Sequence, residues 1–320
     1  MLRVRLRTLL AASGIAGSHR LSRGASISRQ RWTAADLPDM SGSTVVITGA
    51  SSGIGASAAR QLAGAGARVV LAVRDVPKGR AVAGTISGQT EVRLLNLASL
   101  ASVRAFASAW SEPIDILINN AGVMYLPNRR TEDGFELHMG TNHLGHFALT
   151  NLLLPHITQR VVTITSNLAS GGKIDLHDLN WDQRPYKASQ AYADSKQANS
   201  LFTLQLQRQL SLAASGVSAV SAHPGVANTN LMGHLGGLGG SMAKVVVRVI
   251  SQDADRGALP TVYAATKEIP GGSLVCPDGY RHFRGYPELA ASPGSAQDPE
   301  MAAELWSLSA QLTSTDFPSG

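Results

Sequence analysis

Short runs of β-branched and aliphatic residues alternate with longer segments of helical period from Ser43 onward. This alternation limits the possible folds more than any other feature of the chain. Runs of this kind, bounded by turn residues, are typical of buried parallel strands. The strands predicted in this way are Thr44–Thr48, Arg68–Val73, Glu91–Leu95, Ile114–Ile118, Val161–Thr165 and Val217–Ser221.

The segments between these runs have the length and apolar spacing of helices. They are Gly55–Ala65, Leu100–Trp110, Gly134–Leu154 and Ala191–Ala214, with a further helix-like segment near Asp253–Thr266. Strand and helix in alternation predict a single-domain α/β fold, a Rossmann-like doubly wound parallel sheet with helices on both faces and right-handed crossovers. We find no internal repeat and no sign of a second domain.

A glycine-rich turn follows the first predicted strand and opens the first predicted helix. Glycine permits the tight turn and removes the Cβ atoms that would keep a pyrophosphate from the backbone and the helix N-terminus. A P-loop is a poor alternative, because neither Lys-Ser nor Lys-Thr follows the last glycine. The residues expected to bind a dinucleotide here are Gly49, Ser51, Ser52, Gly53, Ile54 and Gly55.

Arg74 follows the second predicted strand, where an acidic residue would hydrogen-bond the adenosine ribose. An arginine can instead pair with a 2′-phosphate through two parallel hydrogen bonds. The sequence therefore favours NADP(H) over NAD(H), which stays an alternative because Arg74 could simply be a surface residue at a strand end. The next residue, Asp75, is expected to be an exposed turn acid.

Tyr192 and Lys196 are four residues apart in a predicted helix, so their side chains share one face. A tyrosine of ordinary pKa near 10 is a poor acid or base at neutral pH. An adjacent ammonium and an oxidised nicotinamide ring would lower that pKa, and Tyr192 could then exchange a proton with a carbonyl or alcohol oxygen. Ser166, at the end of the fifth strand, would hold that oxygen, although Thr165 and Ser170 are neighbouring alternatives.

The net charge of +6 comes from the first 31 residues, which hold seven arginines and no acid. The rest of the chain is close to neutral and has no basic stripe with interleaved aromatics, so a nucleic-acid partner is not expected. Residues 1–31 resemble a mitochondrial transit peptide in composition, and a disordered extension is the alternative. We expect a cytoplasmic enzyme, or one of the mitochondrial matrix if this segment is a transit peptide.

Several further features narrow the chemistry. The single cysteine, Cys276, excludes an internal disulfide and a cysteine cluster, and the histidines lack metal-ligand spacing, so we expect no metal. No uninterrupted apolar stretch is long enough to span a membrane. A glycine-rich segment at about 226–250 is expected to be a substrate lid, with an ordinary surface loop as the alternative.

With these motifs in this order, residues 40–312 resemble the short-chain dehydrogenase/reductase family. The resemblance implies that Tyr192, Lys196, Ser166 and Asn142 are catalytic, with Asn142 holding a water that links Lys196 to solvent. Lys196 and Tyr192 would also contact the cofactor. Further cofactor contacts implied by the resemblance are Asn96, Leu97, Asn120, Ala121, Gly122, Pro224, Gly225 and Thr229. Asn96 departs from the family pattern, which usually has aspartate beside the adenine.

Within that family, Arg74-Asp75 and the run from Thr141 to Phe147 look like the retinol-dehydrogenase and WW-domain-oxidoreductase-like branch and its bacterial relatives. The resemblance implies an NADP(H)-dependent oxidoreductase that interconverts an alcohol and a carbonyl on a lipophilic small molecule. The alternatives are a dinucleotide-sensing binding protein without turnover and a sugar-nucleotide epimerase. The long helices Gly134–Leu154 and Ala191–Ala214 could build a homodimer interface, as they often do in the family.

Overall fold

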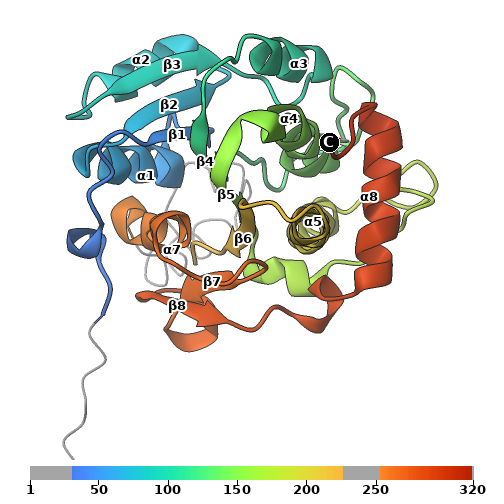
Figure 1. Ribbon diagram of the computed structural model, residues 1–320. Coiled ribbons are helices and arrows are strands. Elements are labelled where there is room, and N and C mark those ends of the chain that lie inside the picture. Colours follow the sequence, from blue (N-terminus) through green and yellow to red (C-terminus); the bar gives the residue numbers. More distant parts are fainter. Residues whose placement is uncertain (1–30, 226–252, 319–320) are drawn as a thin grey trace, which may run out of the picture. The chain divides into compact units, whose positions relative to one another are not determined.

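Eight strands form one sheet in the order β3-β2-β1-β4-β5-β6-β7-β8 (Figure 1). The computed structural model describes residues 31–225 and 253–318. Strands β1 to β7 run parallel, and β8 pairs antiparallel with β7 at the edge. The strands are β1 Thr44–Thr48, β2 Arg68–Val73, β3 Thr90–Leu94, β4 Ile114–Asn119, β5 Ile157–Ile164, β6 Ser218–Ala222, β7 Leu274–Pro277 and β8 Pro287–Ala290.

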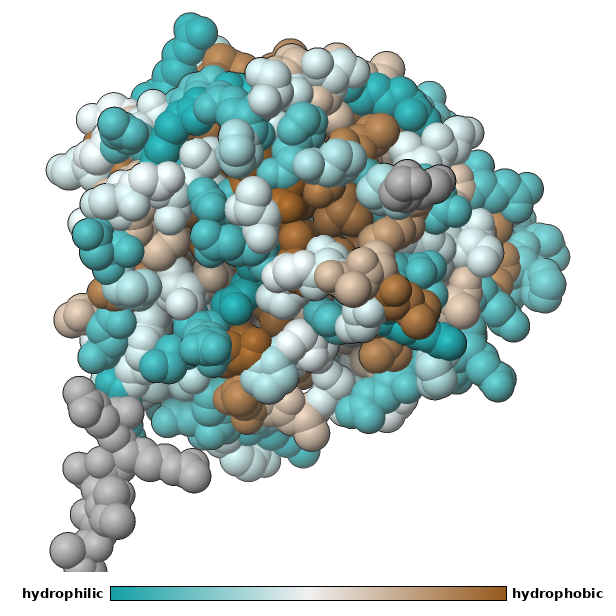
Figure 2. Space-filling model, in the orientation of Figure 1, coloured by the Kyte–Doolittle hydropathy of each residue, from teal (hydrophilic) through white to brown (hydrophobic). Residues whose placement is uncertain are grey.

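Helices cover both faces of the sheet, because successive strand residues point to opposite sides. Val45 and Ile47 belong to one core layer, whereas Val46 belongs to the other. The first layer packs against α1 Gly53–Gly64, α2 Val76–Ala83 and α7 Ala254–Thr266, and the second against α3 Leu100–Ser108, α4 Gly145–Leu153 and α5 Ala188–Leu212. On the face shown in Figure 2, hydrophobic residues gather near the centre and hydrophilic residues cover most of the rim.

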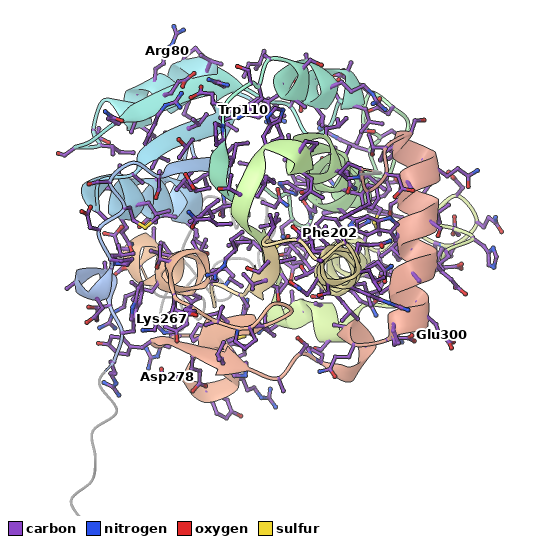
Figure 3. All side chains as sticks on the ribbon, viewed as in Figure 1. Arg80, Trp110, Phe202, Lys267, Asp278 and Glu300 are labelled. Atoms are coloured by element: carbon purple, nitrogen blue, oxygen red, sulfur yellow. The ribbon has the colours of Figure 1, made fainter. Side chains whose placement is uncertain are left out.

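The C-terminal helix α8, Pro299–Thr313, packs outside α4 and α5. Its Trp306 ring stacks on Phe202 of α5 at 5.8 Å and meets Phe147 of α4 edge-on at 4.8 Å. Figure 3 shows Phe202 in the interior, whereas Arg80 and Glu300 lie at the periphery. The chain's own α8 therefore packs against both of the helices that were expected to build a homodimer interface.

The predicted doubly wound fold is confirmed, and the six predicted strands are present with small shifts of their ends. The helix predicted at Gly134–Leu154 is present, but it begins later than predicted. The segment begins as a π-helical turn at Met139–Leu144 and continues as α4, because the buried Glu136 carboxylate receives the amide of Met139 and fixes the start. Helices α2 and α8 and the short edge strand β8 were not predicted.

Among the described residues, none of the helices has both the length and the apolar character needed to cross a membrane.

Candidate active site

The glycine turn after β1 makes the close backbone approaches that its sequence predicts. Gly49 and Gly53 have φ values of 69° and 55°, in the left-handed region that favours glycine. A Cβ atom at Gly49 would lie 2.8 Å from the Ala121 Cα, and one at Gly55 would overlap the Asn120 side-chain amide. The turn is thus packed directly on the segment that follows β4. Ser51, Ser52 and Ile54 lie within the same turn and are partly exposed.

Thr48, the last residue of β1, fastens the segment after β4 to this turn. Its hydroxyl accepts hydrogen bonds from the amides of Asn120 and Ala121, both at 2.9 Å. The Asn120 side chain donates back to the Thr48 carbonyl at 2.7 Å. Asn119, fully buried, donates to Thr150 of α4 at 2.8 Å. These amides brace β4 against its neighbours.

His146 connects Thr48 to the π-helical turn. Its Nδ1 lies 2.9 Å from the Asn142 carbonyl, which can only accept, so the ring proton is on Nδ1. Nε2 therefore accepts the Thr48 hydroxyl proton at 2.8 Å. Burial lowers the pKa of His146 to about 4, and the bond to Asn142 only partly opposes this, so the imidazole is neutral at physiological pH. Sequence reasoning missed both Thr48 and His146.

Asn142 lies in the middle of the π-helical turn, a geometry frequently found at functional sites. Its side-chain oxygen accepts from the Val123 amide at 2.7 Å, and its side-chain nitrogen donates to the Val123 carbonyl at 3.0 Å and to the Ser195 hydroxyl at 2.9 Å. The fully buried side chain thus joins the segment after β4 to α5.

Lys196 lies beside Asn142 and the segment after β4. A Cβ atom at Gly122 would be 3.5 Å from Lys196 Nζ and 3.3 Å from Asn142 Oδ1, so a side chain at this position would crowd both groups. Nζ donates to the Ile164 carbonyl at the end of β5, at 2.9 Å. Burial lowers the pKa of Lys196 to about 8. Lys196 is therefore a buried amine that titrates near neutral pH.

Tyr192 lies one turn before Lys196 in α5 and is 6% exposed. Burial raises its pKa to about 12, although a hydrogen bond with Ser166 lowers it. The expected lowering of the Tyr192 pKa is therefore not produced by the protein's own groups. The reason is that burial penalises the phenolate more than Ser166 stabilises it, while the Lys196 amine bonds to the Ile164 carbonyl.

Ser166 is the serine that contacts Tyr192, and the two neighbouring alternatives are engaged elsewhere. Thr165 donates to the Lys196 carbonyl at 2.9 Å and lies 2.8 Å from the Ser200 hydroxyl. Ser170 is exposed and donates to the Asn167 carbonyl at 2.8 Å. Ser166 begins the turn after β5, where its hydroxyl accepts from the Leu168 amide at 3.2 Å.

The residues expected near the adenosine follow β2 and β3. Arg74 is exposed and has no partner among the described residues, whereas Asp75 caps α2 by accepting from the Lys78 amide at 3.0 Å. The Asn96 side chain accepts from Ala98 and donates to Glu132 at 3.3 Å. Leu97 is buried, and its carbonyl lies so close to Gly145 that α4 could not carry a Cβ there.

Other predicted positions fall into two groups. His143 is buried with Nε2 2.8 Å from the Ser309 hydroxyl, and Cys276 is a buried thiol, so both belong to the core. Pro224 and Gly225 follow β6, with Gly225 at a φ of 73°. Thr229 and the proposed lid at 226–250 lie outside the described residues, as do residues 1–30. Within the described ranges, no cluster of acidic, histidine or cysteine side chains could hold a metal.

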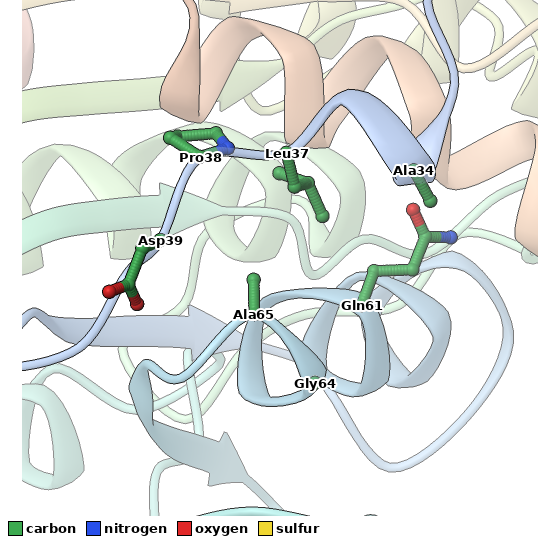
Figure 4. Close-up of a pocket in the computed structure, with 7 residues that line it drawn as sticks. All are labelled: Ala34, Leu37, Pro38, Asp39, Gln61, Gly64 and Ala65. Atoms are coloured by element: carbon green, nitrogen blue, oxygen red, sulfur yellow. The ribbon is translucent and has the colours of Figure 1, made fainter.

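A pocket between the N-terminal segment and α1 is not this site (Figure 4). It is lined by Leu37, Asp39, Gln61 and Ala65, near the C-terminal end of α1. The glycine turn lies at the opposite end of that helix. A helix of this length separates the two by roughly 18 Å.

Four residues near Tyr192 were not identified from the sequence as site residues. The Tyr125 ring lies 5.8 Å from the Tyr192 ring, and the His138 ring lies 6.3 Å from it. His138 Nδ1 is 2.8 Å from Glu136, and the Tyr186 hydroxyl oxygen lies 3.1 Å from the same carboxylate. Tyr186 is not followed by a lysine at the fourth position, so no sequence pattern placed it in the site. Glu136 and His138 are two residues apart in the sequence, and this spacing is not a recognisable motif for a site.

Comparison with known proteins identifies the family. The family model for short chain dehydrogenases matches residues 43–236. The chain is 41% identical to human retinol dehydrogenase 13 over 87% of its length and 86% of that protein, and 40% identical to mouse polyprenol dehydrogenase over 87% and 85%.

Solved structures agree with this. An uncharacterized protein from Mycobacterium paratuberculosis is 50% identical with a TM-score of 0.80, covering 90% of this chain and all of that one. A proposed NAD(P)-dependent gluconate 5-dehydrogenase from Beutenbergia cavernae, with bound NADP at low occupancy, is 26% identical with a TM-score of 0.55, over 71% of this chain and 91% of that one. The chain therefore belongs to the short-chain dehydrogenase/reductase family, in its retinol-dehydrogenase-like branch, and is an alcohol and carbonyl oxidoreductase.

Proposed function

We propose that this enzyme uses NADP(H) to interconvert an alcohol and a carbonyl on a lipophilic small molecule, with Tyr192 as the general acid and base. The proposal is supported by three features that lie next to one another in the structure. Ser166 is close enough to Tyr192 to lower its pKa, Lys196 lies against Gly122, and the segment holding Gly122 is packed on the glycine turn. Proton-transfer groups and a dinucleotide cradle thus adjoin each other.

The residues present fit a dinucleotide. The first turn of α1 has no side-chain cap and no acidic residue, so its amides suit a pyrophosphate. Gly49 and Gly53 adopt the left-handed backbone conformation of the tight turn, and Gly49 and Gly55 let the turn pack closely on Ala121 and Asn120. Arg74 is an exposed cation without a partner among the described residues and would pair with a 2′-phosphate, which supports NADP(H). When bound, the cofactor supplies or accepts the hydride.

The protein's own groups handle the proton. Because burial raises the pKa of Tyr192 to about 12, the phenol keeps its proton at neutral pH and can donate it to a carbonyl oxygen during reduction. In the oxidative direction Tyr192 must lose that proton, which requires a nearby positive charge to lower its pKa. Lys196, with a pKa lowered to about 8, can supply such charge.

Ser166 and Asn142 support this chemistry in different ways. Ser166 would donate a hydrogen bond to the substrate oxygen and stabilise the negative charge that develops there. Asn142 holds Val123 and Ser195, and through them fixes the approach of the segment after β4 to α5. Asn142 would also hold a water near Lys196, because the side chains of both residues lie close to Gly122.

A lipophilic substrate is supported by the relatives, which are named for retinol and polyprenol, both apolar alcohols. A sugar-nucleotide epimerase would need a larger C-terminal substrate domain. The described residues after β6 form only α7, β7, β8 and α8 with short connecting turns. A dinucleotide sensor would not need the joined set of Tyr192, Lys196 and Ser166.

Replacement of Tyr192 by phenylalanine tests the mechanism. We expect Tyr192→Phe to bind NADPH with unchanged affinity and to lose roughly 100- to 10,000-fold in turnover of aldehydes, because the ring stays and the proton donor is lost. Tyr280→Phe is the matched control, since Tyr280 is 78% exposed. Initial rates by nicotinamide absorbance and cofactor titration by fluorescence are the measurements. Wild-type activity in Tyr192→Phe would refute the assignment, and no turnover of any aldehyde by the wild type would favour the sensor.

A further inference from the structure

Tyr125 has a strained backbone. Its φ is 55°, in the left-handed region where a bulky aromatic residue is rarely found. Such a conformation costs on the order of 1–3 kcal/mol and persists only where the surroundings hold it. Tyr125 lies in the loop between the segment after β4 and the π-helical turn. Because its backbone is strained, contacts from the surrounding residues must hold this loop in place.

These contacts are hydrogen bonds to both backbone polar groups of the next residue, Leu126. The Leu126 amide donates to His138 Nε2 at 3.3 Å, and the Leu126 carbonyl accepts from the Tyr186 hydroxyl at 3.0 Å. Since Nε2 accepts, the His138 proton is on Nδ1, which donates to Glu136 at 2.8 Å. We call Glu136, His138 and Tyr186 the Leu126 clamp.

The clamp is a mostly buried polar cluster, in which only Tyr186 is partly exposed, and it has no part in the proton chemistry proposed above. Glu136 and His138 are both 0% exposed. The second carboxylate oxygen of Glu136 accepts from the Met139 amide at 2.8 Å. Burial of Glu136 would raise its pKa, but the hydrogen bonds from His138 and the backbone outweigh this and lower it. A buried carboxylate is costly, so its complete set of partners points to a positional role.

What the clamp positions is the Tyr125 ring beside Tyr192. The two rings lie 5.8 Å apart at an interplanar angle of 60°, and Tyr125 is only partly buried. The Tyr125 hydroxyl makes no hydrogen bond to any described residue, so nothing in the described part of the chain prepares it to transfer a proton. A substrate whose oxygen bonds to the Tyr192 hydroxyl, as proposed above, would therefore have this partly accessible aromatic ring close to its carbon skeleton.

We propose that Tyr125 is a specificity-determining residue, an aromatic wall for the hydrocarbon part of the substrate next to the reacting carbon, and that the Leu126 clamp positions it. The inference rests on the proposed function and deepens it by naming the surface that selects an apolar, extended substrate. An aromatic ring offers a large apolar contact at low cost in side-chain entropy. A long unsaturated chain would contact this wall, whereas a short aldehyde would hardly reach it.

The test compares two probes with NADPH and the full chain: all-trans-retinal and hexanal. We expect Tyr125→Ala to lower kcat/KM for retinal by about tenfold or more, in line with the loss of an apolar contact, while hexanal changes less than threefold. Tyr125→Phe should keep the wild-type ratio of the two kcat/KM values, because the ring is retained. Tyr186→Phe should move the ratio in the same direction as Tyr125→Ala but less, because Leu126 loses one of its two holds.

Tyr280→Ala is the matched control, an exposed tyrosine whose loss should leave the ratio unchanged. Affinity for NADPH should stay constant in all variants, which separates an effect on substrate from a general loosening. If Tyr125→Ala does not fold, Tyr125→Leu removes the ring but keeps the bulk and must show the same shift. An unchanged ratio in a folded Tyr125 variant would overturn the inference. A wild-type enzyme that reduces neither probe would instead refute the proposed function, and the wall with it.

Discussion

The two sides of the active site are built in different ways. The nucleotide side consists of the turn from Gly49 to Gly55 and the segment after β4, and its fit depends on backbone approaches that any side chain would block. The tyrosine side consists of the Leu126 clamp and Tyr125 around Tyr192, and it depends on buried polar side chains from separate segments. Backbone fit leaves a short sequence motif, whereas a polar cluster leaves none.

The largest expected effect concerns the nucleotide side. Gly49→Ala places a Cβ 2.8 Å from the Ala121 Cα on a backbone with a φ of 69°, so we expect NADPH affinity to fall by roughly 10- to 100-fold, corresponding to strain of about 1–3 kcal/mol. Gly64→Ala, at the opposite end of α1 with open space around it, is the control. Fluorescence titration measures both. Equal NADPH affinities of Gly49→Ala and Gly64→Ala would show that backbone fit at the glycine turn does not control cofactor binding.

Glu136→Gln tests the tyrosine side. The amide cannot accept from both His138 and Met139, so one buried donor loses its partner and the free energy of unfolding should fall by about 1–3 kcal/mol. NADPH affinity should change little. The exposed Glu304→Gln is the control, and urea unfolding at pH 7 is the measurement. A variant as stable as the wild type would show that the clamp is not needed to hold this region.

Arg74→Asp tests whether charge, in addition to backbone fit, determines cofactor binding on the nucleotide side. Removing the cation and adding an acid should shift the ratio of kcat/KM for NADPH to that for NADH by about tenfold or more toward NADH, the scale of a lost charge-assisted hydrogen bond. Arg80→Asp, on the exposed side of α2, is the control. An unchanged ratio would remove the reason for preferring NADP(H).

The smallest expected effect is a pH dependence of stability from the histidines behind the site. Burial lowers the pKa of His146 to about 4 and that of His143 to about 3. The unfolded chain binds these protons below about pH 6.5 but the folded protein does not, so the free energy of unfolding should fall as pH drops from 6.5 toward 4. His143→Gln should weaken this slope, and exposed His177→Asn should not. Urea unfolding at several pH values would contradict the expectation if the slopes agreed.

The apolar surfaces of α4 and α5 show the same division between pattern and packing. The helical period of α4 and α5 suggested a shared surface with a second subunit, but Trp306 of α8 packs on Phe147 and Phe202 there. The apolar stripe is filled from within the chain. Periodicity shows that a helix face is covered, and it does not show by which partner.

Most of the fold followed from the sequence because strand-helix alternation is a local signal. Each β-branched run bounded by turns gave a strand, and the glycines after β1 marked the turn. The short helix α2 and the edge strand β8 were missed, since a few residues with mixed burial carry little periodicity. The start of α4 was misjudged because the Glu136 carboxylate, bonded to the Met139 amide, decides it.

By itself, the sequence determined the doubly wound sheet, the glycine turn, and the helical face shared by Tyr192 and Lys196. These depend on spacing along the chain, which a linear pattern records. Only the tertiary structure decided that burial raises the pKa of Tyr192, that Thr48 and His146 tie Asn142 to the glycine turn, and that Tyr125 stands beside Tyr192. Desolvation and contacts between distant segments exist only once the chain has packed, so no spacing of residues can encode them in a readable way.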